Sequence, residues 1–286
     1  MNSLRARDKA GDFRLVSRAN HPDDTIVRVG SLSIGGPNFT VIAGPCSVES
    51  HSQITLCAAK VRSAGGNMLR GGCFKARTSP YAFQGLGLEG LKYLHAAGQH
   101  EGLPIITEVL SHDLVEEVSQ YSDVLQIGAR NMQNYPLLNA VGKSKRPVLL
   151  KRGMSASLDE LLLAAEYILY QGNQQVILCE RGIKTFETET RYTLDIAAIP
   201  ALRLRTHLPV MVDPSHAAGR SDIVAPLALA AKAAGAHGIM VEIHPDPASA
   251  LSDGYQAMTF GQFEELMANP WMQPAESRSF KQAANS

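Results

Sequence analysis

The sequence predicts an α/β fold, a (β/α)8 TIM barrel, and two observations carry this prediction. Short apolar segments with strand character alternate with segments of helical periodicity, eight of each, between residues 38 and 270. Such alternation gives parallel strands joined by right-handed crossovers, and eight units fit the roughly 250 residues typical of a barrel. Continuous apolar strands are expected where both faces of a sheet are buried. A doubly wound open sheet is the alternative, but no Gly-x-Gly-x-x-Gly motif follows the first strand.

Residues 1–37 are predicted to form an N-terminal arm and a β-hairpin that come before the barrel. The first 22 or so residues are polar and lack periodicity. Thr25–Val29 and Leu32–Ile34 flank Gly30 and Ser31, a sequence typical of a hairpin turn. The barrel is expected over residues 38–270, and residues 271–286 are expected to form a C-terminal tail.

The barrel strands are short runs of apolar residues, expected at Thr40–Ala43, Met68–Leu69, Ile105–Val109, Val124–Ile127, Val148–Leu150, Val176–Leu178, Val210–Val212 and Gly238–Ile243. The intervening helices are expected at Ser50–Ala64, Leu88–His100, Asp113–Tyr121, Asn134–Val141, Ser157–Tyr170, Leu194–Arg205, Ile223–Ala234 and Gly261–Ala268. Ser50 is the expected N-cap of the first helix. Ser157 and Glu160 have the spacing of a capping box.

The composition excludes several classes of protein. The chain has 27 Lys and Arg and 27 Asp and Glu residues, so it lacks the basic excess of a nucleic-acid or membrane surface. It has no run of 18 apolar residues, and its N-terminus lacks the apolar segment of a secretory signal. The four cysteines form no Cys-x-x-Cys pair, so a reducing cytoplasm is the expected location.

One long irregular segment, Leu69–Gly87 (LRGGCFKARTSPYAFQGLG), stands out because it carries Arg70, Lys75 and Arg77 among glycines and hydroxyl residues. Long loops inside compact domains are usually functional or disordered, and the aromatic residues in this one favour order. We therefore expect an anion-binding loop at the active site.

Charged residues also follow the other predicted strands, at the end of the barrel where active sites lie. The cations expected at this mouth are Arg70, Lys75, Arg130, Lys151 and Arg181. Unpaired, they would repel one another, so they favour substrates that carry phosphate and carboxylate groups. The plainer alternative is that Lys151 and Arg181 form ordinary ion pairs with Glu108 and Glu180.

A second group at the same strand ends, Cys46, His216, Glu242 and Asp253, offers sulfur, imidazole and carboxylate ligands. This mixture suits a divalent first-row metal such as Mn²⁺, Fe²⁺, Co²⁺ or Zn²⁺, which can polarise an aldehyde carbonyl. Ligands scattered along the chain have no spacing signature, so two alternatives stay open. Cys46 can be a small buried apolar residue, and His216 can be a core or capping residue. A Schiff-base role for Lys75 or Lys151 is a further alternative.

Several segments, in colinear order from about residue 38 to 268, resemble one family of enzymes. They are IAGPCSVES (Ile42–Ser50), the Leu69–Gly87 loop, LQIGARNMQN (Leu125–Asn134), PVLLKRGMSAS (Pro147–Ser157), ILCERGI (Ile177–Ile183), VDPSHAAGR (Val212–Arg220) and VEIHPDPASALSDG (Val241–Gly254). The family is that of the 3-deoxy-D-arabino-heptulosonate 7-phosphate (DAHP) synthases, type Iβ subgroup. The related 3-deoxy-D-manno-octulosonate 8-phosphate synthases typically have Lys-Ala-Asn-Arg-Ser where this chain has Lys75-Ala76-Arg77-Thr78-Ser79. DAHP synthases typically have Lys-Pro-Arg-Thr-Ser, so Arg77 and Thr78 favour DAHP synthase although Ala76 replaces the usual proline.

The resemblance implies a metal-dependent condensation of phosphoenolpyruvate with erythrose 4-phosphate, which gives DAHP and phosphate and opens the shikimate pathway. It implies Cys46, His216, Glu242 and Asp253 as metal ligands, and Arg130, Lys151 and Arg181 as the holders of the phosphoenolpyruvate phosphate. Arg70 and Lys75 would lie near its carboxylate and reacting carbons. Arg77, Thr78 and Ser79 would hold the erythrose 4-phosphate end. Glu108 is assigned to the substrate-binding set as well. Lys75 and His216 are the candidates for proton transfer, and Cys46 completes the catalytic set.

The resemblance also suggests a homotetramer. About 37 residues come before the barrel, too few for the ferredoxin-like or chorismate-mutase-like regulatory domains of many relatives, so no built-in feedback by phenylalanine or tyrosine is expected. A separate regulatory protein stays open. The alternatives for function are the octulosonate enzyme acting on arabinose 5-phosphate, a Schiff-base aldolase, and a non-catalytic barrel that binds sugar phosphates.

Overall fold

Eight parallel strands close into a barrel in the computed structural model, which describes residues 13–272. The predicted arm's residues 1–12 and the predicted tail's residues 273–286 lie outside the described part. Around the barrel the strands follow the order β10 (Gly238–Glu242), β3 (Thr40–Gly44), β4 (Met68–Arg70), β5 (Ile105–Glu108), β6 (Val124–Ile127), β7 (Val148–Lys151), β8 (Val176–Glu180) and β9 (Val210–Val212). The last and first barrel strands pair from Gly238 with Thr40 to Glu242 with Gly44, which closes the sheet. The predicted TIM barrel is confirmed.

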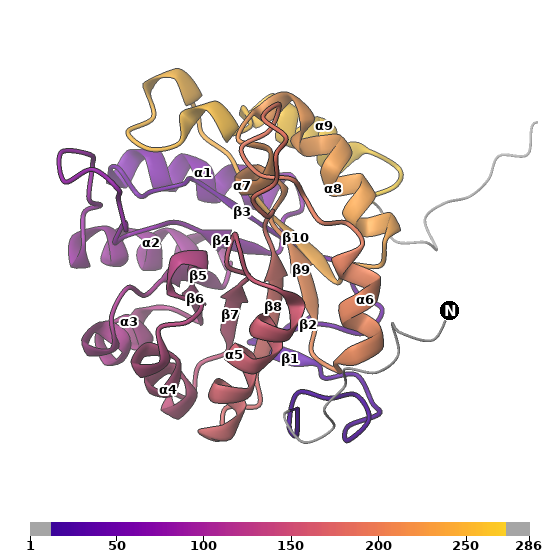
Figure 1. The fold of residues 1–286 in the computed structure, drawn as a ribbon. Helices are drawn as coiled ribbons and strands as arrows, with labels where there is room; N and C mark the ends of the chain where they lie inside the picture. Colours follow the sequence, from indigo (N-terminus) through magenta and orange to yellow (C-terminus); the bar gives the residue numbers. More distant parts are fainter. Residues whose placement is uncertain (1–12, 273–286) are drawn as a thin grey trace, which may run out of the picture.

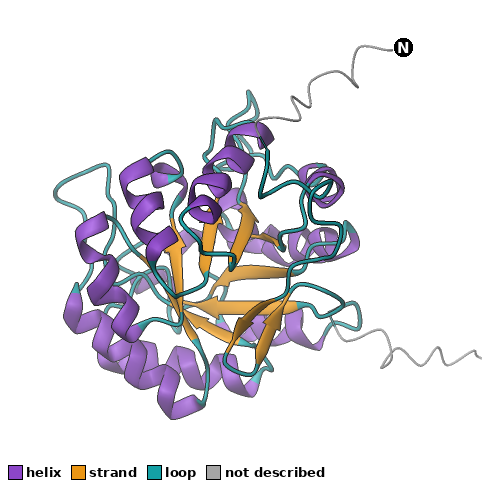
Figure 2. Ribbon diagram, turned by 90° about the horizontal axis from the view of Figure 1, so that it is seen from below, coloured by secondary structure: helices purple, strands orange, loops and turns teal. Residues whose placement is uncertain are grey.

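Helices surround the strands (Figures 1 and 2). They are α1 (His51–Ser63), α2 (Leu88–Glu101), α3 (Val115–Tyr121), α4 (Tyr135–Lys143), α5 (Leu158–Tyr170), α6 (Ala198–Arg205), α7 (Pro214–Ala218), α8 (Val224–Ala233) and α9 (Phe260–Ala268). Short 3-10 turns lie at His112–Leu114, Ala129–Asn131, Ser221–Ile223, Pro247–Ser249 and Gly254–Gln256. No helix of the described residues is long and apolar enough to cross a membrane.

The predicted hairpin forms and closes one end of the barrel. β1 (Val27–Val29) pairs antiparallel with β2 (Leu32–Ile34). Val27, Val29 and Ile34 are buried in one cluster with the inward-facing Ile42 and Met68. Because Met68 lies at the start of its strand, the hairpin covers the N-terminal end of the barrel and leaves the opposite end open.

Two predicted helix starts illustrate local side-chain control. Ser50 accepts a hydrogen bond from the Gln53 amide, and Ser157 and Glu160 form the predicted capping box. Capping of this kind satisfies amide groups that a helix start leaves without partners.

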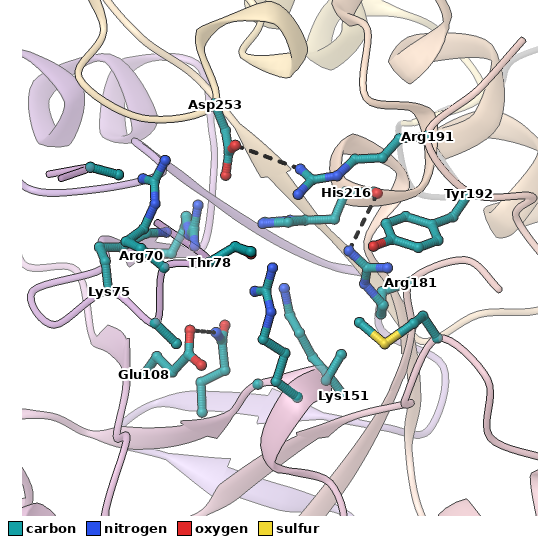
Figure 3. Close-up of a pocket in the computed structure, with 18 of the residues that line it drawn as sticks. Arg70, Lys75, Thr78, Glu108, Lys151, Arg181, Arg191, Tyr192, His216 and Asp253 are labelled. Atoms are coloured by element: carbon teal, nitrogen blue, oxygen red, sulfur yellow. Dashed lines mark hydrogen bonds and ion pairs between the residues drawn. The ribbon is translucent and has the colours of Figure 1, made fainter. Parts of the chain in front are cut away.

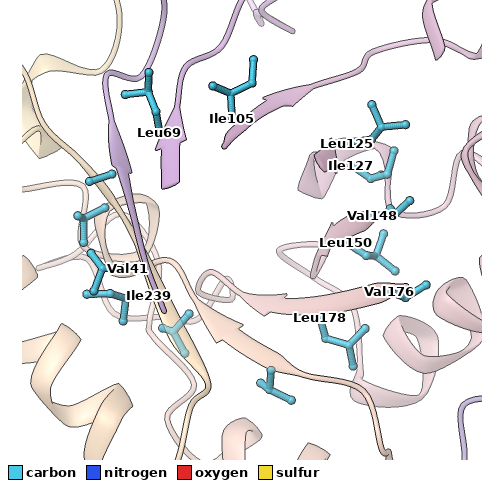
Figure 4. Packing of buried hydrophobic residues seen from close by; sticks show 14 of the residues in the cluster. Val41, Leu69, Ile105, Leu125, Ile127, Val148, Leu150, Val176, Leu178 and Ile239 are labelled. Carbon is cyan, nitrogen blue, oxygen red and sulfur yellow. The ribbon is translucent and has the colours of Figure 1, made fainter. Parts of the chain in front are cut away.

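Between the strands and helices, apolar side chains fill the outer core, as Figure 4 shows for Leu69, Leu125, Val148 and others.

The expected strict alternation of eight strands and eight helices was wrong at one place. The five-residue helix α7 is inserted between β9 and α8, and it is too short to show a periodic pattern in the sequence. The helix expected over Leu194–Arg205 begins only at Ala198. The Asp195 side chain accepts the Ala198 amide and also pairs with Arg152, which holds the residues before the helix in a turn.

Candidate active site at the barrel mouth

A cavity of about 270 Å³ opens at the C-terminal ends of the strands (Figure 3). It collects most of the site residues predicted from the sequence: Arg70, Lys75, Arg77, Thr78, Ser79, Glu108, Arg130, Lys151, Arg181, His216 and Asp253. Thr78, Ser79 and Arg130 lie on the exposed rim, whereas Arg70, Lys151 and Arg181 are buried deeper. Cys46 and Glu242 are buried beside this group and contact Lys75 and Arg70, respectively.

Two of the cations are already paired with carboxylates. Arg70 Nη1 lies 2.5 Å from Glu242 Oε1, and Lys151 forms a buried ion pair with Asp213. The plainer alternative of ion pairs with Glu108 and Glu180 is therefore wrong. Lys151 pairs elsewhere, and Glu180 pairs with Arg152 at 2.9 Å rather than with Arg181.

Other donors at the mouth have no partner. Arg70 Nε, Arg77 Nη1 and Arg181 Nη1 are buried nitrogens without a hydrogen-bond partner in residues 13–272. A buried polar group left unpaired costs about 1–3 kcal/mol, and more when it is charged. Among the described residues, seven cationic side chains but only two carboxylates line the cavity. The cavity is therefore built to receive a ligand with more than one anionic group.

Three of the four predicted metal ligands come together. Ligand atoms of Cys46, His216 and Asp253 all lie within 4.8 Å of one another, and Cys46 Sγ is 3.3 Å from Asp253 Oδ2. A sulfur, a nitrogen and an oxygen donor at such distances fit a divalent first-row metal. Burial and the nearby charge of Glu242 together raise the pKa of the Cys46 thiol to about 12, so a bound cation would be needed to hold the thiolate.

Glu242, the fourth predicted ligand, lies next to this group but outside it among the described residues. Its Oε1 is 3.4 Å from His216 Nε2 but also pairs with Arg70, and its Oε2 accepts a hydrogen bond from Gln256 Nε2 at 2.6 Å. Burial alone would raise the pKa of Glu242. The charges of His216, Arg70 and Lys75 outweigh burial and lower this pKa to about 2.

His216 is oriented by Asp213, a residue that the sequence analysis did not assign to the site. Asp213 caps α7 by accepting the His216 amide at 2.9 Å, and its other oxygen lies 2.7 Å from His216 Nδ1. The carboxylate therefore fixes the ring with Nε2 directed toward the metal-ligand group. Burial lowers the pKa of His216 despite this partner, which favours the neutral, ligating form. The Asp-Pro-x-His spacing was the available sequence signal, since Asp is a preferred helix cap and Pro suits the first turn.

Asp253 is the single described non-glycine residue with a positive φ, at 47°. The loop that carries Asp253 is held by Glu49, a residue outside the cavity lining. Glu49 accepts the Leu251 amide at 2.9 Å and lies 3.3 Å from His244 Nε2. A conformation of this kind costs of order 1–3 kcal/mol and persists where the surroundings impose it, often at functional sites.

Glu108 occupies a space that only glycine at position 128 leaves open. A Cβ on Gly128 would lie 2.0 Å from Glu108 Oε1. Gln126, another cavity residue not predicted from the sequence, donates to Glu108 Oε2 at 3.4 Å. The Gly128-Ala129-Arg130 turn thus sets both the carboxylate and the rim arginine.

The structure adds Arg191 and Tyr192 to the cavity wall. Arg191 Nη1 is 3.6 Å from Asp253 Oδ1 and 3.1 Å from Gln256 Oε1. Both residues lie in the long segment after β8, and no local pattern in the sequence places that segment over the barrel mouth.

Comparison with known proteins gives one consistent result. The model of the DAHP synthetase I family matches residues 22–276. A phospho-2-dehydro-3-deoxyheptonate aldolase of Thermotoga maritima is 52% identical over 255 residues, which cover 89% of this chain and 75% of the relative. A 2-dehydro-3-deoxyphosphooctonate aldolase of Acidithiobacillus ferrooxidans is 31% identical over 247 residues, covering 80% of this chain and 87% of that relative.

Solved structures agree with this result. The crystal structure of a phospho-2-dehydro-3-deoxyheptonate aldolase (DAHP synthase) from Thermotoga maritima matches with a TM-score of 0.87 and 52% identity, over 89% of this chain and 75% of that one. A truncated form of the 3-deoxy-D-arabino-heptulosonate 7-phosphate synthase from the same organism matches with a TM-score of 0.85 and 49% identity, over 90% and 94%.

Proposed function

The chain belongs to the DAHP synthetase I family, and from this premise we propose how its barrel mouth performs the family's reaction. The chain is a transferase that condenses phosphoenolpyruvate with erythrose 4-phosphate to give DAHP and phosphate, the first step of the shikimate pathway and so of aromatic amino acid biosynthesis. The observation that carries the site assignment is a set of three buried guanidinium nitrogens that have no partner among the described residues and belong to side chains lining one cavity beside a metal-ligand group.

Phosphoenolpyruvate is assigned to the deeper part of the cavity. Arg181, Lys151 and Arg130 hold its phosphate, and Arg70 and Lys75 hold its carboxylate. Arg181 Nη1 and Arg70 Nε support this assignment, because each is a charged donor with no partner within residues 13–272. Glu242 pairs with Arg70 and Asp213 pairs with Lys151, and these two ion pairs reduce the repulsion among the cations of the cavity before substrate binds.

Erythrose 4-phosphate is assigned to the outer part, where Arg77, Thr78 and Ser79 face its phosphate. The support is the position of these residues on the cavity wall, together with the buried Arg77 Nη1, which has no partner in the part of the chain that the structure describes. Glu108, on the same wall, is assigned to accept a hydrogen bond from a hydroxyl group of the sugar.

Cys46, His216, Asp253 and Glu242 are the proposed ligands of a divalent Mn²⁺, Fe²⁺, Co²⁺ or Zn²⁺ ion. Such an ion supplies a Lewis acid for the aldehyde oxygen. The close approach of three of the ligand atoms supports this proposal, as does the histidine already oriented by a carboxylate. Glu242 would complete the set as the fourth ligand, since its Oε1 lies 3.4 Å from His216 Nε2.

The chemistry requires one proton to reach the aldehyde oxygen as C3 of phosphoenolpyruvate forms the new carbon–carbon bond. Lys75 is suited to donate this proton, because its Nζ lies 3.0 Å from Cys46 Sγ at the centre of the site. Burial alone would lower the pKa of Lys75, but Cys46 and Glu242 raise it, so the side chain carries its proton. Water then adds at C2 and gives one proton to the neutral Lys75 amine. The C2–O bond to phosphate breaks as the new C2 hydroxyl becomes the ketone carbonyl, and the hydroxyl proton passes to the departing phosphate.

A Schiff-base mechanism is disfavoured on the same grounds. An amine must be unprotonated to attack a carbonyl. Lys151 Nζ is engaged in an ion pair with the buried Asp213, and the raised pKa of Lys75 keeps that side chain as an ammonium group.

The test is to measure phosphoenolpyruvate consumption with erythrose 4-phosphate and with arabinose 5-phosphate, before and after metal chelation. We expect turnover with erythrose 4-phosphate, loss of turnover on chelation, and recovery with added metal. Comparable turnover with arabinose 5-phosphate would contradict the aldose assignment. Covalent trapping by borohydride, or full activity of metal-free Cys46→Ser protein, would contradict the mechanism.

We also propose that residues 38–270 form the catalytic barrel of a homotetramer that acts in the cytoplasm. Four buried free cysteines suit a reducing compartment. The exposed Tyr167 and Tyr170 on α5, with Tyr135 of α4 beside Tyr167, offer apolar surface for contact between subunits. Light scattering coupled to size-exclusion chromatography would measure the assembly. A regulatory partner remains a separate proposal, to be tested by co-purification.

A further inference from the structure

Arg181 differs from the other buried cations of the mouth in how it is held. We propose that Tyr192 is a positioning residue that holds the Arg181 guanidinium against the substrate phosphate without neutralising its charge. This inference rests on the proposed function, because it takes Arg181 as a holder of the phosphoenolpyruvate phosphate.

The geometry supports an aromatic platform under Arg181. Arg181 Cζ lies 4.2 Å from the centre of the Tyr192 ring, within the range of a cation–π contact. Arg181 Nη2 lies 3.4 Å from the His216 carbonyl oxygen, and Nη1 is buried without a partner among the described residues. Figure 3 shows the ring beside the guanidinium, at the edge of the cavity.

Glu180, the carboxylate residue directly before Arg181 in the sequence, makes its contacts with other groups. Its Oε2 pairs with Arg152 at 2.9 Å, and its Oε1 accepts the Gly182 amide at 2.6 Å. Arg70 and Lys151, in contrast, each face a carboxylate directly. Of these three buried cations, Arg181 is therefore the one whose charge no ion pair among the described residues neutralises.

An aromatic face suits this task for a physical reason. A carboxylate partner would use two N–H donors of a guanidinium and cancel its charge, whereas a ring face restrains the plane and leaves the donors at its edge available. Restraint of this kind reduces the conformational entropy that Arg181 loses when a phosphate binds. The expected benefit is tighter phosphate binding rather than faster chemistry.

The fold fixes Tyr192 in this position. Its amide donates to the Ala217 carbonyl of α7 at 2.8 Å, and the flanking Thr193 exchanges two backbone hydrogen bonds with Ile183. Gly182 has a φ of +92°, and a Cβ at this position would lie 2.7 Å from the Tyr192 Cβ. The chain thus needs glycine directly after Arg181 so that the tyrosine can return over it.

Arg191 shares the ring but cannot replace Arg181. Its Cζ lies 5.8 Å from the centre of the Tyr192 ring, and its guanidinium is directed to Asp253 and Gln256. The two arginines therefore serve different halves of the site, and changes at Tyr192 should affect the phosphate half first.

The experiment compares Tyr192→Leu with Tyr192→Phe, and uses Tyr93→Leu as a control, because Tyr93 of α2 also contacts another ring, that of His51, and neither residue lines the cavity. For Tyr192→Leu we expect the KM for phosphoenolpyruvate and the Kd of inorganic phosphate to rise about fivefold, the order of an exposed cation–π contact. The kcat and the KM for erythrose 4-phosphate should stay within about twofold. Tyr192→Phe should restore the parent constants.

A double-mutant cycle with Arg181→Ala separates the proposed role from a general structural one. If Tyr192 acts through Arg181, Tyr192→Leu should cause no further loss in the Arg181→Ala background. An unchanged phosphate Kd in Tyr192→Leu, a Phe variant as weak as the Leu variant, or additive losses in the cycle would overturn the proposal. If Tyr192→Leu does not fold, the same cycle is run with Tyr192→Met. Lack of turnover by the parent enzyme would instead count against the proposed function, since phosphate binding tests Tyr192 independently.

Discussion

Replacing Asp213 by asparagine changes one oxygen at the point where the metal-ligand group meets the phosphate-binding cations. Asp213 is fully buried and accepts the His216 amide at 2.9 Å, contacts His216 Nδ1 at 2.7 Å, and pairs with Lys151. Asparagine keeps the shape and the capping oxygen but removes the negative charge. Its NH₂ group can also donate to Nδ1, which would favour the tautomer with the proton on Nε2.

Two effects of different size follow from these contacts. Loss of a partner that orients a metal-ligating histidine typically weakens metal binding by about 10–100-fold. Removal of one member of a buried ion pair leaves Lys151 uncompensated and costs on the order of 3 kcal/mol of unfolding free energy. Burial alone would raise the pKa of Asp213, but His216 and Lys151 hold it well below its usual value, so the carboxylate is charged at neutral pH.

The assay is metal titration by calorimetry against a competing chelator, together with urea unfolding of the metal-free protein. Asp195→Asn is the matched control, because Asp195 also pairs with a buried cation, Arg152, at 2.9 Å but does not contact His216 through any described interaction. We expect both variants to lose stability and only Asp213→Asn to lose metal affinity. Unchanged metal affinity in folded Asp213→Asn protein would refute the assigned orientation of His216.

Three further predictions concern separate parts of the site. Arg77→Ala should raise the KM for erythrose 4-phosphate about tenfold, the order expected for loss of a charged hydrogen bond. The KM for phosphoenolpyruvate should stay within about twofold of the parent value. Steady-state kinetics with each substrate varied in turn would measure both constants. Glu242 has a pKa lowered from 4.5 to about 2, so the stability that it contributes is present above pH 4.5 and is lost as the pH falls toward 2. The difference in unfolding free energy between the parent and Glu242→Gln should therefore shrink from about 3 kcal/mol at pH 6 toward zero at pH 2 in urea titrations. Gly128→Ala should displace the Glu108 carboxylate, because Oε1 would lie 2.0 Å from the added Cβ, and kcat/KM should fall about tenfold or more. Gly261→Ala is the control: its added Cβ would have its nearest atom 3.9 Å away, so this variant should retain kcat/KM.

Each of these predictions has an outcome that contradicts it. Equal effects of Arg77→Ala on the two KM values would remove the division of the cavity between two substrates. A pH-independent difference between the parent and Glu242→Gln would show that Glu242 does not gain its charge stabilisation on folding. Parent-like kinetics of Gly128→Ala would show that Glu108 can move without loss and has no fixed role.

The sequence alone was sufficient for the barrel and for most of the cavity wall. Strand positions such as Val124–Ile127 and Val210–Val212 matched the structure, because strands buried on both faces leave short continuous apolar runs. Once the strands were placed, the active-site end of the barrel followed from topology, and Arg70, Lys151 and Arg181 fell at the cavity without further information.

Which charged side chains pair with one another could not be predicted from the sequence in the same way. The ion pair of Lys151 with Asp213 joins residues 62 positions apart, and the pair of Arg70 with Glu242 joins residues 172 apart. Which carboxylate reaches which cation depends on the tilt and register of strands around the barrel, and no local pattern encodes these. The plainer expectation of ion pairs with Glu108 and Glu180 failed for this reason.

What the sequence determined by itself is therefore the list of chemical groups at the barrel mouth, since each strand end is a local feature. What only the tertiary structure decided is which of those groups are free to act. Glu180 pairs with Arg152 and leaves the Arg181 guanidinium against the Tyr192 ring, and Asp213 orients His216 through its contact with Nδ1. Such roles depend on distances between distant segments, which the closed barrel fixes and the order of residues along the chain does not.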